Sequence, residues 1–405
     1  MDTLARLKAR PLYLSQFEAL RGNGLIKVVV GMRRCGKSSL MRLFAQSLEK
    51  QGVPADHIIQ MNFESSAYFN TRTYRDLVDA VQKQMQGEGR YYLLFDEVQL
   101  VESWEKAINS FRVDLDVDIY LTGSNAYLLS SQLATLLSGR YVEINVHPLS
   151  FSEFLTFIEV DEVECAFERY LMYGGLPPVV EQGEDQFLAQ TVLSGIFDTV
   201  FVKDIARHVQ IRNSLVLSDI ASYLADTAGS RVSVTNIENR LKSAHRKTST
   251  ETIERYLQAL VDAFLFQRVR RYDVKGGAFL QGLEKYYPSD LGIKNMLLGF
   301  PEGDYGFALE NAVCNELKVR NYEIRVGKTD TLEIDFVAKR KDETLFVQVS
   351  ASLMDAQTRE REFAPFKAVS AKPGKKLLLT LDRLGLGMQG DVEVCNAVDW
   401  LLGRS

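Results

Sequence analysis

The chain has 405 residues, of which 46% are hydrophobic, and a formal net charge of −5 at pH 7. This length exceeds one ordinary hydrophobic core, so we expect two or three domains. The negative charge excludes a general attraction to nucleic acid, and any such contact needs a local basic patch. Four scattered cysteines without a CxxC pair favour a reducing compartment over a zinc site. With no apolar signal segment and no run near the roughly 20 apolar residues of a membrane span, we expect a cytoplasmic protein without membrane contact.

A glycine-rich loop follows the first predicted strand, Ile26–Val30, and leads directly into a predicted helix. Residues 31–38 fit the pattern Gly-x-x-x-x-Gly-Lys-Ser, whose backbone N–H groups bind polyphosphate. We expect Lys37 to reach the β- and γ-phosphates and the Ser38 hydroxyl to bind Mg²⁺. The pattern therefore predicts a nucleoside triphosphate site with ATP and Mg²⁺ as cofactors. The predicted nucleotide-binding residues are Gly31, Arg33, Arg34, Cys35, Gly36, Lys37, Ser38 and Ser39.

Two acidic residues, Asp96 and Glu97, end a later predicted strand that starts at Tyr91 and is largely apolar. Such a strand is typical of a parallel sheet that helices cover on both faces. Ligands of these sheets bind at the carboxyl ends of the strands. We therefore predict a doubly wound α/β NTP hydrolase, in which Asp96 is a ligand of Mg²⁺ and Glu97 activates the attacking water.

The next predicted strand, residues 117–122, runs into Gly123, Ser124 and Asn125. In a doubly wound ATPase this position lies beside the γ-phosphate. Thr122, Ser124 and Asn125 are candidates for sensing that phosphate, and we group Asn125 with the catalytic residues. Simple turn chemistry is the alternative explanation for these polar residues.

The middle of the chain, residues 211–280, combines three predicted helices with a following strand. Ser and Thr residues at the start of the third helix are typical caps, and the pattern favours a winged-helix domain with a recognition helix. Basic residues concentrate here and can contact the phosphates of DNA. A protein-docking module or a plain ATPase lid is the alternative. The predicted DNA-binding residues are Arg246, Lys247, Arg255, Arg270 and Arg271.

The last part of the chain resembles the PD-(D/E)xK nuclease fold, with Glu310 on a predicted helix and Asp335 on a predicted strand. The nuclease pattern requires Glu-x-Lys on the next strand, where this chain has Gln348 and Ser350. The two remaining carboxylates can hold Mg²⁺ only weakly, and the positively charged stabiliser of the reaction is missing. We therefore predict a degenerate nuclease site that does not cleave, in a fold kept for DNA binding or assembly.

The order of these motifs resembles the AAA+ ATPase family in which an AAA domain precedes a DUF4143 region. The resemblance also rests on four further segments: Leu137–Arg140, Pro148–Phe154, Tyr173–Pro177 and Lys285–Gly292. It implies four domains: a P-loop AAA+ core at 1–155, a helical lid or connector at 156–210, a winged helix at 211–280 and a restriction-endonuclease-like α/β domain at 281–405.

The resemblance adds a role for Arg140. From residue chemistry alone, an arginine after a Ser-Gly turn is usually a charge exposed to solvent. The family implies instead that Arg140 is an arginine finger that completes the ATP site of a neighbouring subunit. Such fingers contribute roughly 10³–10⁵ in the turnover of phosphoryl transfer. Arg33 and Arg34 are competitors for this role. The resemblance also implies a homo-oligomer, with a hexameric ring as one form.

These observations together predict an ATP-hydrolysing protein that couples turnover to DNA binding or remodelling, with branched DNA as one substrate. The first alternative is an ATP-dependent switch or scaffold for protein docking. The second is an ATP-regulated nuclease, which Gln348 and Ser350 disfavour.

Overall fold

The computed structural model divides the chain into two compact units, Met1–Val146 and His147–Ser405. No helix in the part that it describes is long and apolar enough to cross a membrane. The described residues are 7–123, 137, 139–158, 162–183, 185–206, 211, 213–280, 282–301, 305–329 and 332–404.

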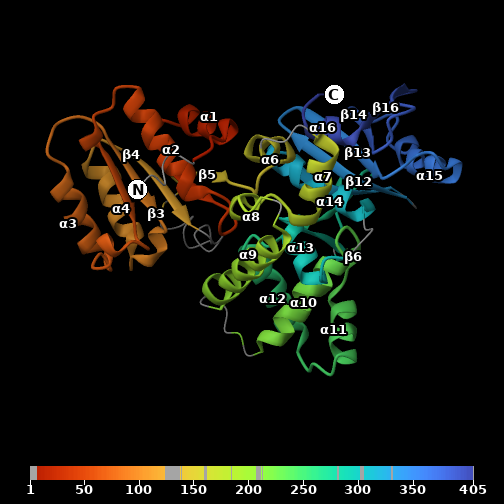
Figure 1. Ribbon diagram of the computed structural model, residues 1–405, viewed down its shortest axis with the longest axis horizontal. Coiled ribbons are helices and arrows are strands. Elements are labelled where there is room, and N and C mark those ends of the chain that lie inside the picture. Colours follow the sequence, from red (N-terminus) through yellow and green to blue (C-terminus); the bar gives the residue numbers. More distant parts are fainter. Residues whose placement is uncertain are drawn as a thin grey trace. The chain divides into compact units, whose positions relative to one another are not determined.

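The N-terminal unit alternates strands with helices (Figure 1). Helix α2 illustrates why these segments are helical. Its apolar residues Leu40, Phe44 and Leu48 recur every fourth residue and are all buried on one face. The elements are α1 (Pro11–Ala19), β1 (Ile26–Val30), α2 (Lys37–Lys50), β2 (Ile58–Asn62), α3 (Tyr74–Gln84), β3 (Tyr91–Asp96), α4 (Trp104–Asp114), β4 (Val117–Gly123) and β5 (Tyr141–Asn145).

The five strands of this unit form one sheet in the order β2-β3-β4-β1-β5, and every neighbouring pair is parallel. Strands β1 and β3 are buried along their whole length, as expected for a sheet covered on both faces. The predicted parallel α/β architecture is therefore confirmed. Because β4 lies between β1 and β3, its carboxyl end lies between the glycine-rich loop and the two acidic residues.

The C-terminal unit begins with helices and ends with a large sheet (Figure 1). Its first part contains α6 (Phe151–Ile158), α7 (Val163–Tyr173), α8 (Pro177–Val180), α9 (Gln186–Thr199), the π-helix η6 (Val200–Ile205), α10 (Ser214–Asp226), β6 (Arg231–Val232), α11 (Val234–Ser243), α12 (Thr250–Asp262), β7 (Phe266–Val269), β8 (Arg271–Asp273), β9 (Ala278–Phe279) and β10 (Glu284–Pro288). Its last part contains α13 (Leu291–Leu298), α14 (Tyr305–Val319), β11 (Glu323–Lys328), β12 (Glu333–Arg340), β13 (Glu343–Ser350), α15 (Ala356–Lys367), β14 (Lys375–Thr380), β15 (Gly387–Gln389), β16 (Val392–Asn396) and α16 (Ala397–Leu401).

Helices α10, α11 and α12 adjoin a three-stranded sheet in the order β6-β10-β7. Strand β10 pairs antiparallel with both of its neighbours. Side chains of Asn213, Ser233 and Ser249 cap the three helices, which explains where each helix begins. The short strands β8 and β9 lie between β7 and β10 in the chain but belong to the other sheet.

The eight-stranded sheet has the order β15-β16-β14-β13-β12-β11-β8-β9. Strands β11, β12 and β13 are antiparallel neighbours, and β14 pairs parallel with β13. One apolar cluster joins this sheet to α6, α7, α14 and α16, and a second joins it to α15 through Phe366. The sheet therefore carries helices on both faces.

Asp290 ties the turn after α7 to the start of α13. Its carboxylate accepts hydrogen bonds from the backbone N–H groups of Gly175, at 2.8 Å, and Ile293, at 3.2 Å. A Cβ on Gly174 would lie only 2.3 Å from the same carboxylate. Burial raises the pKa of Asp290 to about 6, although hydrogen bonds from backbone N–H groups oppose this shift. The Gly-Gly turn is therefore a structural junction.

Candidate functional site

The glycine-rich loop joins β1 to α2 with two left-handed backbone positions. Gly31 has φ 147°, and a Cβ there would lie 2.0 Å from the carbonyl oxygen of Val146. Gly36 has φ 105° and stands at the N-cap of α2. In the described part of the chain no side chain caps this helix. The first N–H groups of α2 therefore remain available to an anion.

Lys37 is held inside the loop that precedes it. Its ammonium donates to the carbonyl oxygens of Gly31, at 2.8 Å, and Met32, at 3.0 Å. Only 5% of Lys37 is exposed. An ammonium group has three donors, so the same position can also donate to a phosphate oxygen at the helix N-terminus.

Three arginines lie at or beside the loop. Arg33 forms an ion pair of 3.1 Å with Glu64, and Arg34 is exposed with φ 68°. Arg10, which the sequence analysis missed, is 3% exposed and donates to the carbonyl oxygen of Cys35 at 3.0 Å. A single Arg before a helix matches no sequence motif, so only the fold shows that Arg10 supports the loop.

Thr122 holds the two acidic residues at the end of β3. Its hydroxyl donates a hydrogen bond to Asp96 and accepts one from the backbone N–H of Glu97 at 3.0 Å. Thr122 is fully buried, and Asp96 and Glu97 are 7% and 8% exposed. The hydroxyl predicted as a possible phosphate sensor therefore orients the acid pair.

Glu97 combines an uncommon backbone conformation with a buried carboxyl group. It adopts φ 56° and ψ 45°, a left-handed conformation that is uncommon for a non-glycine residue. Burial raises the pKa of its carboxyl group, with Asp96 adding to the effect, whereas Lys37, Gln99 and Arg33 oppose it. Gln99 donates a side-chain hydrogen bond to Glu97. A carboxylate with a raised pKa accepts a proton more readily, which suits activation of water.

The donor set fits Mg²⁺ and a triphosphate. The Ser38 hydroxyl follows Lys37 on the first turn of α2, and the Asp96 carboxylate ends the strand two places away in the sheet. Hydroxyl and carboxylate oxygens are typical Mg²⁺ ligands beside substrate phosphates. When bound, the metal ion would neutralise charge on the phosphates. Ser39 lies on the same first turn of α2, and Cys35 is buried within the loop.

The remaining predicted catalytic residues have different positions. Ser124 and Asn125 lie outside the described residues. Arg140 is exposed and directly precedes β5. Its backbone carbonyl accepts a hydrogen bond from the N–H of Ile26 at 3.0 Å, so it lies where β1 and β5 begin.

The predicted DNA-binding residues differ in accessibility. Lys247 and Arg255 are exposed, and Arg270 is exposed and stacks on Phe279. Arg246 is half-buried and pairs with Asp219 at 3.0 Å. The prediction for Arg271 needs correction, because this side chain is 8% exposed and lies 3.7 Å from a carboxylate oxygen of Glu333.

The four residues of the predicted degenerate nuclease site lie on α14, β12 and β13. Gln348 donates to Glu362 at 2.8 Å and accepts from the backbone N–H of Asp335 at 3.3 Å. Ser350 donates to the carbonyl oxygen of Ser352 at 3.0 Å. Burial and the neighbouring Glu310 raise the pKa of Asp335. Among the described residues no group of three or more His, Cys, Asp or Glu side chains is arranged to hold a metal ion.

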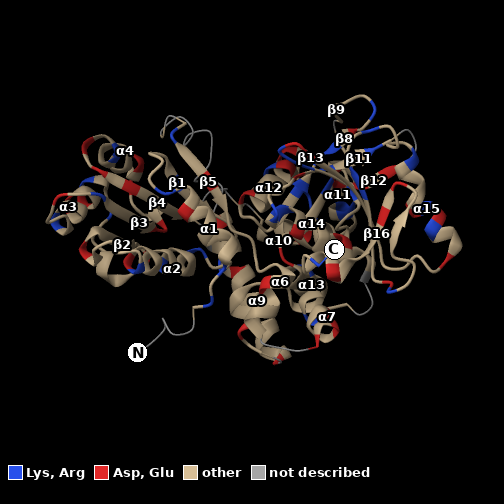
Figure 2. Cartoon of the chain, turned by 90° about the horizontal axis from the view of Figure 1, so that it is seen from above, with Lys and Arg blue, Asp and Glu red and all other residues tan. Residues whose placement is uncertain are grey.

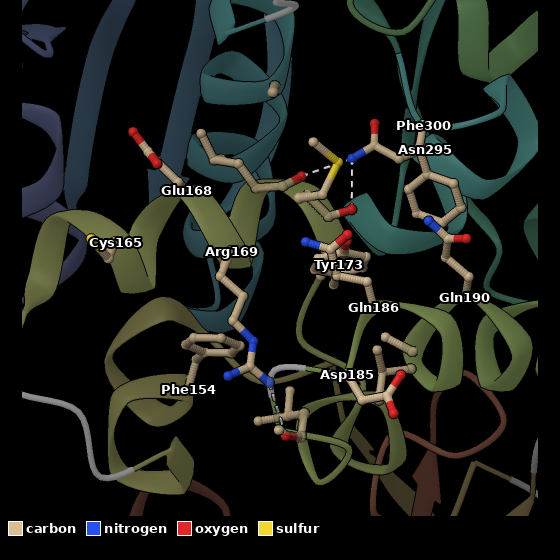
Figure 3. Close-up of a pocket in the computed structure, with 18 of the residues that line it drawn as sticks. Phe154, Cys165, Glu168, Arg169, Tyr173, Asp185, Gln186, Gln190, Asn295 and Phe300 are labelled. Carbon is tan, nitrogen blue, oxygen red and sulfur yellow. Dashed lines mark hydrogen bonds between the residues drawn. The ribbon is translucent and has the colours of Figure 1, made fainter. Parts of the chain in front are cut away.

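A cavity of about 720 Å³ lies in the C-terminal unit between α6, α7, α9 and α13 (Figure 3). Arg169 at its wall donates to the carbonyl oxygen of Val180 at 3.3 Å. Asn295 donates to the carbonyl oxygens of Leu171 and Met172 at 2.9 and 2.8 Å. These donors serve the protein's own backbone, so we assign no ligand to the cavity.

Two family models match the chain. The model described as an AAA domain matches residues 23–155, which include the loop, the acid pair and the whole sheet of the N-terminal unit. A model described as a domain of unknown function, DUF8612, matches residues 165–304. The expected DUF4143 region is not confirmed by these matches.

Three relatives extend this result. An uncharacterized protein of Haemophilus influenzae is 39% identical over 400 residues, covering 97% of this chain and 98% of the relative. The uncharacterized protein MJ1544 of Methanocaldococcus jannaschii is 28% identical over 357 residues, which is 84% of this chain and 78% of the relative. The Walker-type ATPase PABY2304 of Pyrococcus abyssi has a similar fold, with a TM-score of 0.52 and 18% identity over 72% of this chain and 96% of that one. The chain therefore belongs to the family of the Haemophilus influenzae protein, and its residues 23–155 match the model of an AAA domain.

Proposed function

We propose that the protein hydrolyses ATP with Lys37 on the phosphates, Ser38 and Asp96 on Mg²⁺, and Glu97 as the base for water. The observation that carries this assignment is the pair of hydrogen bonds at the Thr122 hydroxyl, which donates to the Asp96 carboxylate and accepts from the backbone N–H of Glu97. They hold the acid pair at the end of β3, two places from β1 in the sheet. Preorganised groups of this kind lower the barrier because they need no rearrangement during the reaction.

Arg140 is proposed to act on a neighbouring subunit. Val30, which precedes the glycine-rich loop, pairs with Asn145 at the end of β5, whereas Arg140 precedes the start of β5. A five-residue strand is about 16 Å long, so Arg140 and the loop of the same chain lie at opposite edges of the sheet. An exposed Arg at that edge can complete the site of another copy, which supports a homo-oligomer. Heterologous contacts between copies close into rings.

The proposed DNA contact is made by the three-helix part of the C-terminal unit. The three helices α10, α11 and α12 combine with the antiparallel sheet β6-β10-β7. This combination is typical of a winged helix and supports the prediction of a winged-helix domain. Lys247 precedes the third helix, α12, and Arg255 lies on it, and both are exposed. Figure 2 shows further Lys and Arg positions along β8, β9 and β11, which belong to the eight-stranded sheet of the same unit.

The C-terminal sheet is proposed to be a nuclease fold without activity. Its core order α14-β11-β12-β13-α15-β14, with three antiparallel strands and a parallel fourth, supports the resemblance to PD-(D/E)xK enzymes. Gln348 and Ser350 stand where the pattern requires Glu and Lys, and both are bonded within the protein. A role in DNA binding or assembly is consistent with these contacts.

The first experiment is steady-state ATP turnover with single-stranded, duplex and four-way-junction DNA. Stimulation by one structure would support a DNA-coupled ATPase and identify its substrate. Basal turnover without any response would favour the alternative function, an ATP-dependent docking switch. DNA affinity of the double variant Lys247→Glu/Arg255→Glu should fall, and the slope of its salt dependence should fall by about 1 for each lost phosphate contact. The matched control Lys367→Glu/Lys372→Glu changes two exposed lysines in and after α15 and should leave both quantities unchanged.

A further inference from the structure

A buried lysine of strand β10 lies among carboxylates of the nuclease-like site. The Lys285 ammonium is 2.9 Å from Glu333 and 3.4 Å from Glu310. Its side chain is 5% exposed. Burial alone would lower the pKa of Lys285, but Glu310, Asp335 and Glu333 together raise it above its ordinary value. The lysine therefore remains charged. It is the cation that Glu310 and Glu333 share, and Arg231 and Arg271 add positive charge at Glu333.

The cluster joins three elements that are distant in the chain. Glu310 lies on α14, whereas Glu333 and Asp335 lie on β12. Tyr287, two residues after Lys285 on β10, donates to the same Glu310 oxygen at 2.6 Å. Residues two apart on a strand point to the same face, so β10 presents both an ammonium and a hydroxyl to Glu310.

The backbone of Gly229 covers the Glu310 carboxylate. This glycine has φ 76°, and a Cβ there would lie 3.1 Å from a carboxylate oxygen of Glu310. The next strand, β6, contributes Arg231, which pairs with Glu333 at 3.0 Å. Residues of the three-helix part thus lie against both Glu310 and Glu333.

A divalent metal ion does not fit this site as it stands. In the nuclease pattern the helix acid and the strand acid share the metal. Here an ammonium lies 3.4 Å from the helix acid, Glu310, and 2.9 Å from Glu333, two residues before the strand acid. Glu310 already accepts from Lys285 and Tyr287, and the fixed positive charge would repel a second cation. Hard divalent cations bind carboxylate oxygens at about 2.0–2.6 Å, whereas Glu333 and Glu310 lie 2.9 and 3.4 Å from the ammonium nitrogen.

We propose that the Lys285 ammonium replaces a divalent metal ion in the Glu310–Glu333–Asp335 cluster and joins strand β10 to α14 and β12 without metal. Two consequences follow. The C-terminal sheet depends on β10 for charge balance, so it is completed only together with the three-helix part. Removal of the ammonium leaves Glu310 and Glu333 without their shared cation, and an added divalent cation should bind weakly to these two carboxylates in its place.

The test compares thermal unfolding of the full-length chain in EDTA, in Ca²⁺ and in Mn²⁺, without nucleotide. Lys285→Met should lower the unfolding temperature by roughly 5–15 °C in EDTA, and millimolar Ca²⁺ or Mn²⁺ should restore part of the loss by binding only the folded state. The wild-type chain should respond to neither cation. Lys376→Met is the matched control, because Lys376 is 6% exposed and pairs with Asp391, a carboxylate that is itself exposed. This control should show no restoration.

Two results would overturn the proposal: a folded Lys285→Met chain whose unfolding temperature ignores both cations, or a wild-type chain that gains as much from them as the variant does. If Lys285→Met does not fold, the double variant Lys285→Met/Glu310→Gln decides the question. Removing one carboxylate along with the ammonium restores part of the charge balance, so recovery of a folded chain supports the proposal. A double variant that still does not fold overturns it.

Discussion

Thr122 and Asp96 are joined by a buried hydrogen bond between the ends of two neighbouring strands. Their strands pair up to Phe95 and Leu121, so the contact lies one residue beyond the last paired positions. The same hydroxyl accepts the backbone N–H of Glu97. One side chain thereby sets the positions of both acids.

Thr122→Val should lower ATP turnover about 10- to 100-fold while the dissociation constant for ATP stays within about threefold. Valine keeps the shape of threonine but removes a hydrogen bond to a charged group, which contributes about 1.5–3 kcal/mol. Steady-state hydrolysis and calorimetric ATP titration measure the two quantities. Thr122→Ser retains the hydroxyl and serves as the control; equal losses in both variants would show that the hydroxyl is not responsible.

Lys37→Ala should abolish ATP binding, whereas Glu97→Gln should retain binding and lower turnover by about 10²–10⁴. The first change removes the cation at the phosphates, and the second removes only the base. Nucleotide titration and phosphate release distinguish these effects. Lys50→Ala, an exposed residue at the end of the same helix, should change neither. Loss of ATP binding in Glu97→Gln would contradict the assignment of Glu97 as the base.

Arg140→Ala and Glu97→Gln chains should each be nearly inactive alone and recover turnover when mixed. In mixed oligomers some Arg140→Ala sites receive an intact arginine from a Glu97→Gln neighbour. Random mixing in a ring with heterologous contacts gives about a quarter of all sites this arrangement. Phosphate release after mixing measures the recovery. The control is Arg34→Ala, which removes an arginine from the loop itself and should not recover turnover when mixed with Glu97→Gln chains. If Arg140→Ala does not recover turnover either, Arg140 acts within its own chain.

Asp290 should make the protein less stable as the pH rises from about 4 to 6. Burial raises its pKa to about 6 in the folded chain, against about 3.9 in an unfolded one. Between these values the folded state binds more protons, so the free energy of unfolding falls with rising pH and is then constant above pH 6. Two pKa units correspond to about 3 kcal/mol. Denaturant unfolding gives the free energy of unfolding of wild type and of Asp290→Asn at each pH. The difference between the two free energies should shrink as the pH rises, and a constant or growing difference would refute the prediction.

The sequence by itself predicted the glycine-rich loop and its place between β1 and α2. The predicted phosphate contact depends on one short loop, which contains Gly31, Gly36 and Lys37. Because these residues are close in the chain, their spacing is sufficient to predict the contact. The apolar strand that ends in Asp96 and Glu97 likewise predicted the parallel sheet, because burial on both faces leaves a continuous apolar run. Ser249 marked the start of α12 for the same local reason.

Only the tertiary structure decided which distant side chains meet. Thr122 contacts Asp96 because β4 lies beside β3, and no local pattern gives that strand order. Arg271 looked like a DNA contact in a basic stretch, but β8 joins the large sheet and buries it beside Glu333. Lys285 reaches Glu310 from 25 residues away in the chain, where no motif pairs them. Such contacts depend on long-range packing, since charges attract whichever partner the fold brings within a few ångströms.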